Sequence, residues 1–234
     1  NVPLSPTLLQ LLDQAHYGLS PWNNLAVNDV SIANAPKITL VSNPGCYATS
    51  ILMAVLPLLK SRTNPLKGPL IDPTSIVIDA KSGTSGGGRS ATETLMFTEV
   101  YGECTPYRVG RHQHLPEIIR YTNEFAQTKI DPFFSTSLLP IKRGITSAVY
   151  AKPGIELQGK TDEEIRFALE RAFQEAYEGY SLVRFGSLDK PGTPDRILTS
   201  FKYVVGYPFT HVGYAVQNGK IYLFSVIDNL LKGA

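Results

Sequence analysis

The spacing of apolar residues changes along the chain, and this change predicts two kinds of structure. Helical spacing is clearest in residues 161–177, where one face carries Ile165, Leu169, Ala172, Phe173, Ala176 and Tyr177. Thr161 and Glu164 fit a capping box at the start of that helix. Residues 7–15, 46–60, 90–103 and 115–127 are further helix candidates. Pro57 is expected to kink or end the helix that begins at residue 46.

Runs rich in β-branched and aromatic residues predict strands at 37–42, 75–80, 133–140 and 144–152. Two more runs, 209–217 and 220–227, flank Asn218-Gly219, a pair that suits the positive φ angles of a two-residue hairpin turn. Strand–helix units come first, and several strands around one long helix follow. The sequence therefore predicts an α/β start that runs into an α+β domain with a mixed, largely antiparallel sheet and helices packed on it.

Composition narrows the class of protein. A net charge of +2 over 234 residues gives no argument for nucleic acid or an anionic membrane as a partner, and no apolar run is long enough to span a bilayer. The two cysteines do not resemble a disulfide framework, so we expect a reducing compartment and a cytoplasmic location. The chain begins at Asn1 and ends in "NLLKGA", so we expect a fragment, and an organellar origin with a lost transit peptide stays open.

Cys46 lies in "VSNPGCYATS", directly after a Pro-Gly turn and directly before a predicted helix. Unpaired backbone N–H groups and the helix dipole favour negative charge at such a junction. We therefore expect the pKa of Cys46 to fall and its thiolate to act as a nucleophile. The alternative for Cys46 is a small buried hydrophobic residue. Cys104 has no comparable sequence context, and we interpret it as structural.

Two further motifs carry chemistry. "YRVGRHQHLPEI", residues 107–118, combines His112 and His114 with Arg111, which suits a proton-handling imidazole beside a cation that holds an anionic substrate. A metal site is the alternative, but no matching Cys/His cluster occurs elsewhere. "KSGTSGGGR", residues 81–89, offers backbone N–H groups to phosphate or lets a ligand approach closely, although a flexible loop explains it equally well.

In this order, the motifs resemble N-acetyl-γ-glutamyl-phosphate reductases of arginine biosynthesis. "SNPGCYAT" resembles the family's active-cysteine signature, "DAKSGTSGGGR" its glycine-rich loop and "HQHLPEI" its histidine motif. "YGL", "PIKRGI" and "DNLLKGA" match as well. The resemblance implies a fold like aspartate-semialdehyde dehydrogenase and the C-terminal domain of glyceraldehyde-3-phosphate dehydrogenase. It implies three regions: 1–45 as a remnant of the dinucleotide-binding domain, 46–227 as the catalytic and dimerisation domain, and 228–234 as the start of a returning helix.

The resemblance also implies the reaction and the roles of residues. Cys46 would attack an acyl phosphate to give a thioester, which NADPH would reduce to a semialdehyde. His114 would be the acid/base. His112, Arg111, Arg143 and Asn43 would bind the substrate, and the residues bordering the NADP cofactor would be Ser82, Gly83, Ser85, Gly86 and Asn229. No metal is implied, and the enzyme would be a homo-oligomer, either a dimer or a tetramer.

The choice between the two histidines rests on the helix that follows them. Leu115 and Pro116 suit a first helical turn, so His114 lies near the positive end of that helix, which keeps a neutral base available. Three alternatives to the reductase stay open: an inactive catalytic and dimerisation fragment, another acyl-phosphate reductase such as aspartate-semialdehyde dehydrogenase, and a cysteine hydrolase that uses Cys46 and His114.

Overall fold

The structure, a computed structural model, describes residues 16–19, 41–60, 68–90, 92–189 and 195–233. The chain divides into two compact units, Asn1–Pro44 and Gly45–Ala234. In the first unit, β1 (His16–Tyr17) pairs in parallel with β2 (Val41–Ser42). The helix predicted at 7–15 and most of the strand predicted at 37–42 lie outside the described residues.

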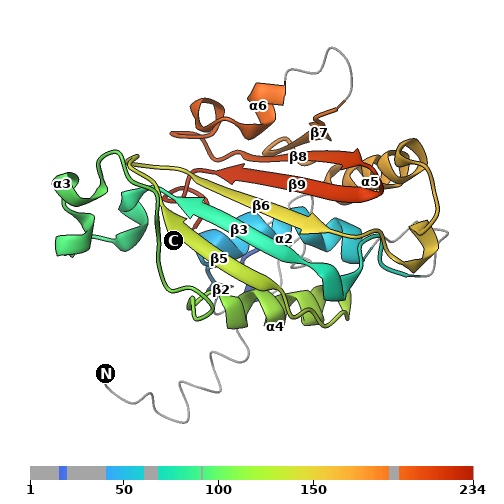
Figure 1. Cartoon of the computed structure of the whole chain (residues 1–234), viewed down its shortest axis with the longest axis horizontal. Helices are drawn as coiled ribbons and strands as arrows, with labels where there is room; N and C mark the ends of the chain where they lie inside the picture. The colour runs from blue at the N-terminus through green and yellow to red at the C-terminus, as the bar shows by residue number, and fades with distance from the viewer. Residues whose placement is uncertain (1–15, 20–40, 61–67, 91, 190–194, 234) are drawn as a thin grey trace, which may run out of the picture. The chain divides into compact units, whose positions relative to one another are not determined.

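The second unit is built on a seven-stranded sheet with the order β4-β5-β3-β6-β9-β8-β7 (Figure 1). Its strands are β3 (Val77–Ser82), β4 (Thr105–Pro106), β5 (Phe133–Leu138), β6 (Ile145–Ala151), β7 (Val183–Ser187), β8 (Thr210–Gln217) and β9 (Lys220–Ile227). The β3–β5 and β7–β8 pairs are parallel, and the four other neighbouring pairs are antiparallel. This confirms the predicted mixed, largely antiparallel sheet.

Helices cover one face of this sheet. In Figure 1, α2 (Cys46–Leu59) and α5 (Asp162–Tyr177) lie behind the strands, and α4 (Leu115–Ala126) packs against α2. A cross-strand row of buried side chains faces them, namely Phe134, Ile78, Val149, Leu223 and Tyr214. The ring of Tyr47 in α2 lies 5.9 Å from that of Phe134, and Phe173 in α5 stacks on Tyr214 at 5.3 Å. The core therefore lies between the sheet and these helices.

Helix α2 is buried from Tyr47 to Leu59, and it continues past Pro57. Proline has no N–H to donate to the carbonyl four residues earlier, which is that of Met53. The Tyr177 hydroxyl donates to this carbonyl instead. A hydrogen bond from α5 thus replaces the missing one, and the helix ends two residues after the proline rather than at it.

Two local signals are confirmed at the predicted residues. Thr161 caps α5 in a capping box, in which its hydroxyl accepts from the Glu164 amide and Glu164 accepts from the Thr161 amide. Asn218 and Gly219 both have positive φ, at 52° and 64°, between β8 and β9. Asp162, the first residue of α5, accepts from both of their backbone amides, which joins the helix to the hairpin.

The prediction for residues 90–103 is wrong. Among the described residues of this range, only a 3-10 turn at Glu93–Leu95 and the four-residue α3 (Phe97–Val100) form. Phe97 is 72% exposed, so the described residues offer it no packing surface that would support a longer helix. Strand β7 and the short α6 (Asp195–Thr199) were not predicted. Within the described ranges, no helix combines the length and apolar character needed to cross a membrane.

Candidate functional site

The candidate site begins at Cys46, the first residue of α2. Gly45 caps this helix in an extended conformation and offers no side chain to the first turn. Its backbone N–H donates to Glu117 Oε1 at 3.0 Å, which ties the start of α2 to the first turn of α4. Cys46 is half-buried, whereas the helix beyond it is buried. The thiol is thus the part of α2 that a small molecule can reach most easily.

The imidazole of His114 lies directly on Gly45. A Cβ atom added to residue 45 would be 2.5 Å from His114 Nε2 and 2.7 Å from its two neighbouring ring carbons. His114 is itself the N-cap residue of α4, as its position in the sequence predicted. The fold therefore places the ring of the predicted acid/base against the residue that precedes the predicted nucleophile, although His114 and Cys46 are 68 positions apart in the sequence.

The expectation that the Cys46 pKa falls is contradicted. Burial raises the pKa of Cys46 above its ordinary value of 9.0, and the opposing hydrogen bonds from the helix-start amides of Tyr47 and Cys46 are weaker. Burial also lowers the pKa of His114, although the Glu117 carboxylate opposes this. Both groups are therefore neutral at pH 7. The neutral imidazole was expected, but the main cause of its lowered pKa is burial rather than the helix dipole.

His112 lies in an aromatic cluster rather than in an open loop. It is 5% exposed, and its ring centroid lies 5.0 Å from that of Tyr47 and 5.5 Å from that of Phe134. Its Nδ1 accepts a hydrogen bond from the His114 backbone N–H at 3.2 Å. Burial, with help from His114 and Arg108, lowers the pKa of His112 to about 4. These contacts support the backbone of His114, and the predicted substrate contact of His112 stays a prediction.

A pair of tyrosines beside the thiol had no predicted role. The Tyr107 hydroxyl donates to the Tyr47 hydroxyl at 2.9 Å, and Tyr47 directly follows Cys46. Tyr107 is fixed by Thr136, to which it donates its N–H and from which its carbonyl accepts. Burial raises the pKa of both tyrosines, so both keep their protons at neutral pH. Nothing in the local sequence pairs residues 47 and 107, because their contact is tertiary.

The predicted anion-binding residues are placed differently from one another. Arg111 is exposed, and Asn43 is an exposed residue of the first unit. Arg143 forms an ion pair with Asp228, a residue for which the sequence predicted no role. The predicted substrate contacts of all three stay predictions. Among the described residues, no three His, Cys, Asp or Glu side chains are grouped as metal ligands would be.

The glycine-rich loop is fastened to a neighbouring segment. The backbone N–H groups of Gly83, Thr84 and Ser85 donate to the carbonyls of Gly144, Ile141 and Lys142. These amides are therefore not free to cradle a phosphate. A Cβ on Gly83 would lie 2.8 Å from the Ile141 carbonyl oxygen, so the glycine is needed for this close approach. On the other side of the loop, Asn229 Nδ2 donates to Ser85 Oγ at 3.0 Å.

The segment after β9 returns to Cys46. A Cβ on Gly233 would lie 2.1 Å from Cys46 Cα and 2.2 Å from Cys46 Cβ, so the backbone at residue 233 lies against the cysteine. The "DNLLKGA" motif, residues 228–234, covers this segment, but the family resemblance implies a role for Asn229 alone. The glycine in that motif was the available signal, because close backbone approach is one of the few reasons to require glycine.

These features define an α+β domain that carries a thiol beside an imidazole at the start of a buried helix. The chain belongs to the semialdehyde dehydrogenase family, since residues 46–229 match the family described as "Semialdehyde dehydrogenase, dimerisation domain".

The chain is also similar in sequence to named proteins from two Bacillus species. The chain is 36% identical over 224 residues to N-acetyl-γ-glutamyl-phosphate reductase of Bacillus anthracis, and 36% identical to the protein of that name from Bacillus cereus. Each match covers 96% of this chain and 57% of the relative, so the chain spans little more than half the length of these proteins.

Solved structures show the same fold. Aspartate semialdehyde dehydrogenase from Francisella tularensis matches 97% of this chain and 69% of its own, with a TM-score of 0.63 and 17% identity. A probable aspartate-semialdehyde dehydrogenase from Pseudomonas aeruginosa matches 99% of this chain and 66% of its own, with a TM-score of 0.59 and 15% identity. At these identities the likeness concerns the fold alone.

Proposed function

We propose that this chain is the catalytic part of an NADPH-dependent reductase that converts N-acetyl-γ-glutamyl phosphate to N-acetylglutamate semialdehyde in the cytoplasm, for arginine biosynthesis. The observation that carries the proposal is the His114 imidazole against Gly45, the residue that precedes the Cys46 thiol. The 36% identity to the named reductases supports the choice of substrate. An acyl phosphate of aspartate is the neighbouring alternative, because the solved structures share the fold.

The first step follows from the protonation states. Because the thiol and the imidazole are both neutral before the reaction, the thiol has to lose its proton during the step, and sulfur attack is proposed to be coupled to proton transfer to the imidazole. The Cys46 sulfur bonds to the acyl carbon, its proton passes to His114 Nε2, and the carbon–oxygen bond to phosphate breaks. Inorganic phosphate leaves, and an acyl thioester stays on Cys46. Accepting at Nε2 requires the neutral imidazole to carry its proton on Nδ1, a buried atom that has no partner among the described residues.

The residues proposed to border NADP gather on the glycine-rich loop and the segment after β9. A Cβ on Gly86 would meet Ser82 Oγ at 3.1 Å and Asn229 Nδ2 at 3.7 Å, so a glycine keeps this polar corner open. That corner, with Gly83 and Ser85 beside it, fits an amide-bearing ring. When bound, NADPH supplies the hydride that reduces the thioester. The proposed contacts concern only this end of the cofactor, so tight binding would require a dinucleotide-binding domain as well.

The first half of the reaction can be tested without NADPH. We expect the chain, mixed with N-acetyl-γ-glutamyl phosphate, to release about one phosphate per Cys46 and to gain the acyl mass on that residue. Cys46→Ala should release none, and Cys104→Ser should behave like the parent. Continued phosphate release with a transient thioester would identify a hydrolase instead. No phosphate release and no adduct would identify an inactive fragment, and a faster reaction with aspartyl phosphate would move the substrate to the neighbouring reductase.

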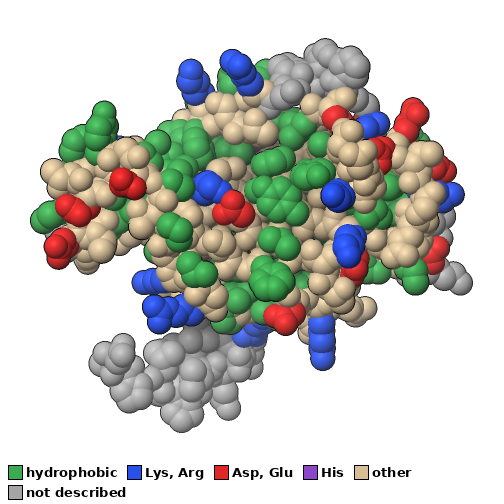
Figure 2. Space-filling view, viewed as in Figure 1, with side chains coloured by type: hydrophobic (Ala, Val, Ile, Leu, Met, Phe, Trp, Pro, Cys, Tyr) green, Lys and Arg blue, Asp and Glu red, His purple; other side chains and the backbone are tan. Residues whose placement is uncertain are grey.

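The open face of the sheet supports assembly of two copies. It carries an apolar cross-strand row made of Phe133, Val77, Tyr150, Tyr222 and Ala215. Figure 2 shows hydrophobic side chains gathered over the middle of this face. Phe133 is 80% exposed and Val77 is 39% exposed. Exposing such an apolar row to water is unfavourable, and exposed apolar patches often mark protein–protein contacts. Because the family is described as a dimerisation domain, a second copy of this chain is the proposed occupant.

A further inference from the structure

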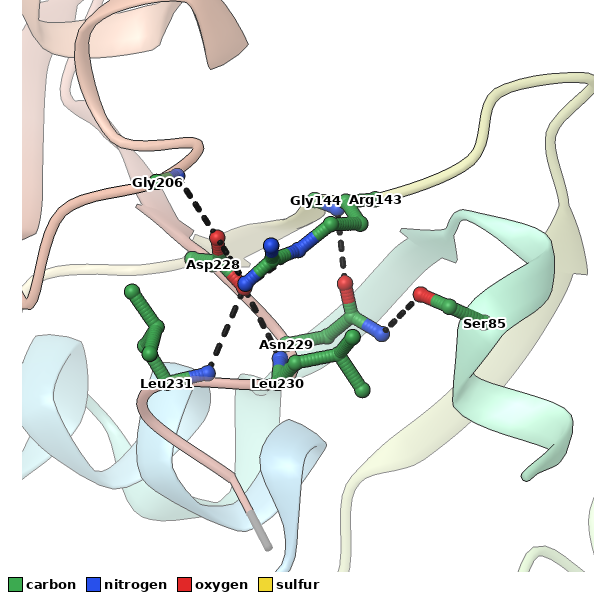
Figure 3. Close-up of polar contacts among 8 residues, drawn as sticks. All are labelled: Ser85, Arg143, Gly144, Gly206, Asp228, Asn229, Leu230 and Leu231. Carbon is green, nitrogen blue, oxygen red and sulfur yellow. Dashed lines mark hydrogen bonds and ion pairs between the residues drawn. The ribbon is translucent and has the colours of Figure 1, made fainter. Parts of the chain in front are cut away.

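Asp228 is a buried carboxylate that joins several segments at the end of β9. Its side chain is 0% exposed. One oxygen accepts from the Gly206 amide at 2.7 Å, and the other accepts from the amides of Leu230 and Leu231 at 2.9 and 3.3 Å. Figure 3 shows these donors around the carboxylate, with the Arg143 guanidinium lying beside it. A carboxylate with this many donors is held in one orientation.

Electrostatics keep this carboxylate charged. Burial alone would raise the pKa of Asp228, but the amides of Gly206 and Leu230 and the Arg143 guanidinium together lower it. The group is therefore an anion at any pH near neutrality, and it is a fixed partner for a cation.

Arg143 uses only one edge of its guanidinium for this pair. Nη2 lies 2.8 Å from Asp228 Oδ2 and 2.9 Å from Oδ1, and Nε lies 3.3 Å from Oδ1. The guanidinium carries five N–H donors in a rigid plane, so the Nη1 side is left over. In the described part of the chain Nη1 has no hydrogen-bond partner, and the Arg143 side chain is 27% exposed. Asp228 thus fixes one edge of the Arg143 guanidinium, and the other edge presents N–H donors to solvent.

The pair lies at the same end of the domain as the thiol. The Lys232 amide donates to the Asp228 carbonyl at 2.9 Å, so residues 228–232 fold into a single turn. Gly233, the next residue, lies against Cys46. From the same turn, Asn229 accepts from the Gly144 amide at 2.7 Å and donates to Ser85. The turn therefore connects the segment that carries Arg143, the glycine-rich loop and the nucleophile.

We infer that Asp228 is a positioning residue, which fixes Arg143 so that the free edge of its guanidinium binds an anionic group of the substrate beside Cys46. The inference rests on the proposed function for the identity of the substrate. The chemistry recognised is a pair of anionic oxygens, which either the phosphoryl group or a carboxylate of the substrate can supply. Two parallel N–H groups of a held guanidinium match both groups.

Protection of Cys46 tests the inference without turnover. We would measure alkylation of Cys46 by iodoacetamide at alkaline pH, with increasing inorganic phosphate in one series and N-acetylglutamate in the other. The anion that binds Arg143 should protect Cys46 in the parent chain. Asp228→Asn should raise the half-protecting concentration about tenfold or more. Loss of protection by phosphate would assign the phosphoryl group, and loss of protection by N-acetylglutamate alone would assign the carboxylate.

Control variants separate positioning from general stability. Asp189→Asn breaks a comparable pair, in which Arg166 donates Nε and Nη2 at 2.9 Å, and it should leave protection unchanged. Arg143→Lys keeps a cation for Asp228 but removes the planar fork, so it should lose protection even if Asp228→Asn does not fold. A low, non-denaturing concentration of guanidinium should restore protection to Arg143→Ala, because Asp228 can bind the added cation. It should not restore protection to the double variant that also carries Asp228→Asn.

Three results would overturn the inference: no protection by either anion in the parent chain, parent-like protection in Arg143→Lys, or parent-like protection in a folded Asp228→Asn. A chain that follows the predicted protection pattern but never forms the thioester would retain the anion site and refute the proposed reaction alone.

Discussion

Replacing Gly45 by alanine should slow the chemistry of Cys46 by displacing the His114 imidazole. Gly45 has φ −62° and ψ 154°, which alanine adopts without strain, so the methyl group is the only steric change. That methyl carbon would lie 2.5 Å from His114 Nε2, whereas ordinary contacts begin at 3.4 Å. The ring must therefore retreat by about 0.9 Å, the difference between these two distances.

The expected size of the effect follows from this displacement. A misplacement of about 1 Å can cost roughly 10²-fold in rate. Complete loss of a general base costs about 10²–10⁴-fold, which sets an upper limit. We expect Gly45→Ala to slow acylation of Cys46 by about 10–10²-fold, equivalent to roughly 1.4–2.7 kcal/mol of activation free energy. Alanine is also a poorer helix cap than glycine, so the free energy of unfolding should fall by only about 1 kcal/mol or less.

The assay is the rate of phosphate release in the first turnover, with urea unfolding measured in parallel. Gly68→Ala is the matched control, because a Cβ there meets nothing within 4 Å. Combining Gly45→Ala with His114→Gln tests the route of the effect, since the methyl should cost nothing further once the base is gone. The reasoning fails if Gly45→Ala stays within twofold of the parent, or if its effect is unchanged in the His114→Gln background.

Three further predictions follow from the site and the sheet. At pH 7 we expect iodoacetamide to label exposed Cys104 before Cys46, with Cys46 labelling rising in alkaline solution because burial raises the pKa of its thiol; equal labelling at pH 7 in a mass-mapped time course would contradict this. In a chain extended by the proposed cofactor domain, His114→Ala should mainly lower kcat, whereas His112→Ala should raise KM and lose roughly 2–4 kcal/mol in urea unfolding, because its ring lies in an aromatic cluster; a kcat loss confined to His112→Ala would exchange the two roles. Tyr222→Glu should dissociate the proposed dimer in light scattering while Arg171→Glu, at an exposed site on α5, should not; a dimer that Tyr222→Glu leaves intact would place the interface elsewhere.

Local signals predicted the elements whose stability is decided locally. The capping box at Thr161 and the Asn218-Gly219 turn form as expected because the side chain or the backbone freedom of those residues is sufficient. The prediction for residues 90–103 failed because a helix of that length needs a surface on which to bury Phe97, and the described residues leave that side chain 72% exposed. Strand β7 was missed because it is short, contains Gly186 and is set by parallel pairing with β8.

The candidate site divides in the same way. Its residue types could be recognised from motifs, and His114 does lie against Gly45, the residue that precedes Cys46. The direction of the Cys46 pKa could not be predicted, because it depends on the balance between the helix-start amides and burial, and burial is a property of the packed structure. Asp228 was missed for a related reason, since its donors come from three segments that are brought together only by the fold.

The pH dependence of stability should reveal this neutral site directly. The folded-state pKa of Cys46 is raised above 9.0, so the stability that depends on its bound proton is complete below about pH 9 and is lost as the pH rises through the folded-state value. The pKa values of His114 and His112 are lowered from 6.5, so their contribution is complete above about pH 6.5 and is lost as the pH falls, for His112 towards about 4. Unfolding by urea across pH should therefore show a plateau between these limits. Cys46→Ala should extend the plateau on the alkaline side only, and His114→Gln should reduce the loss on the acid side only. A Cys46→Ala variant with an unchanged alkaline limb would show that the thiol is not held neutral by burial, and the coupled attack and proton transfer proposed for Cys46 and His114 would lose its basis.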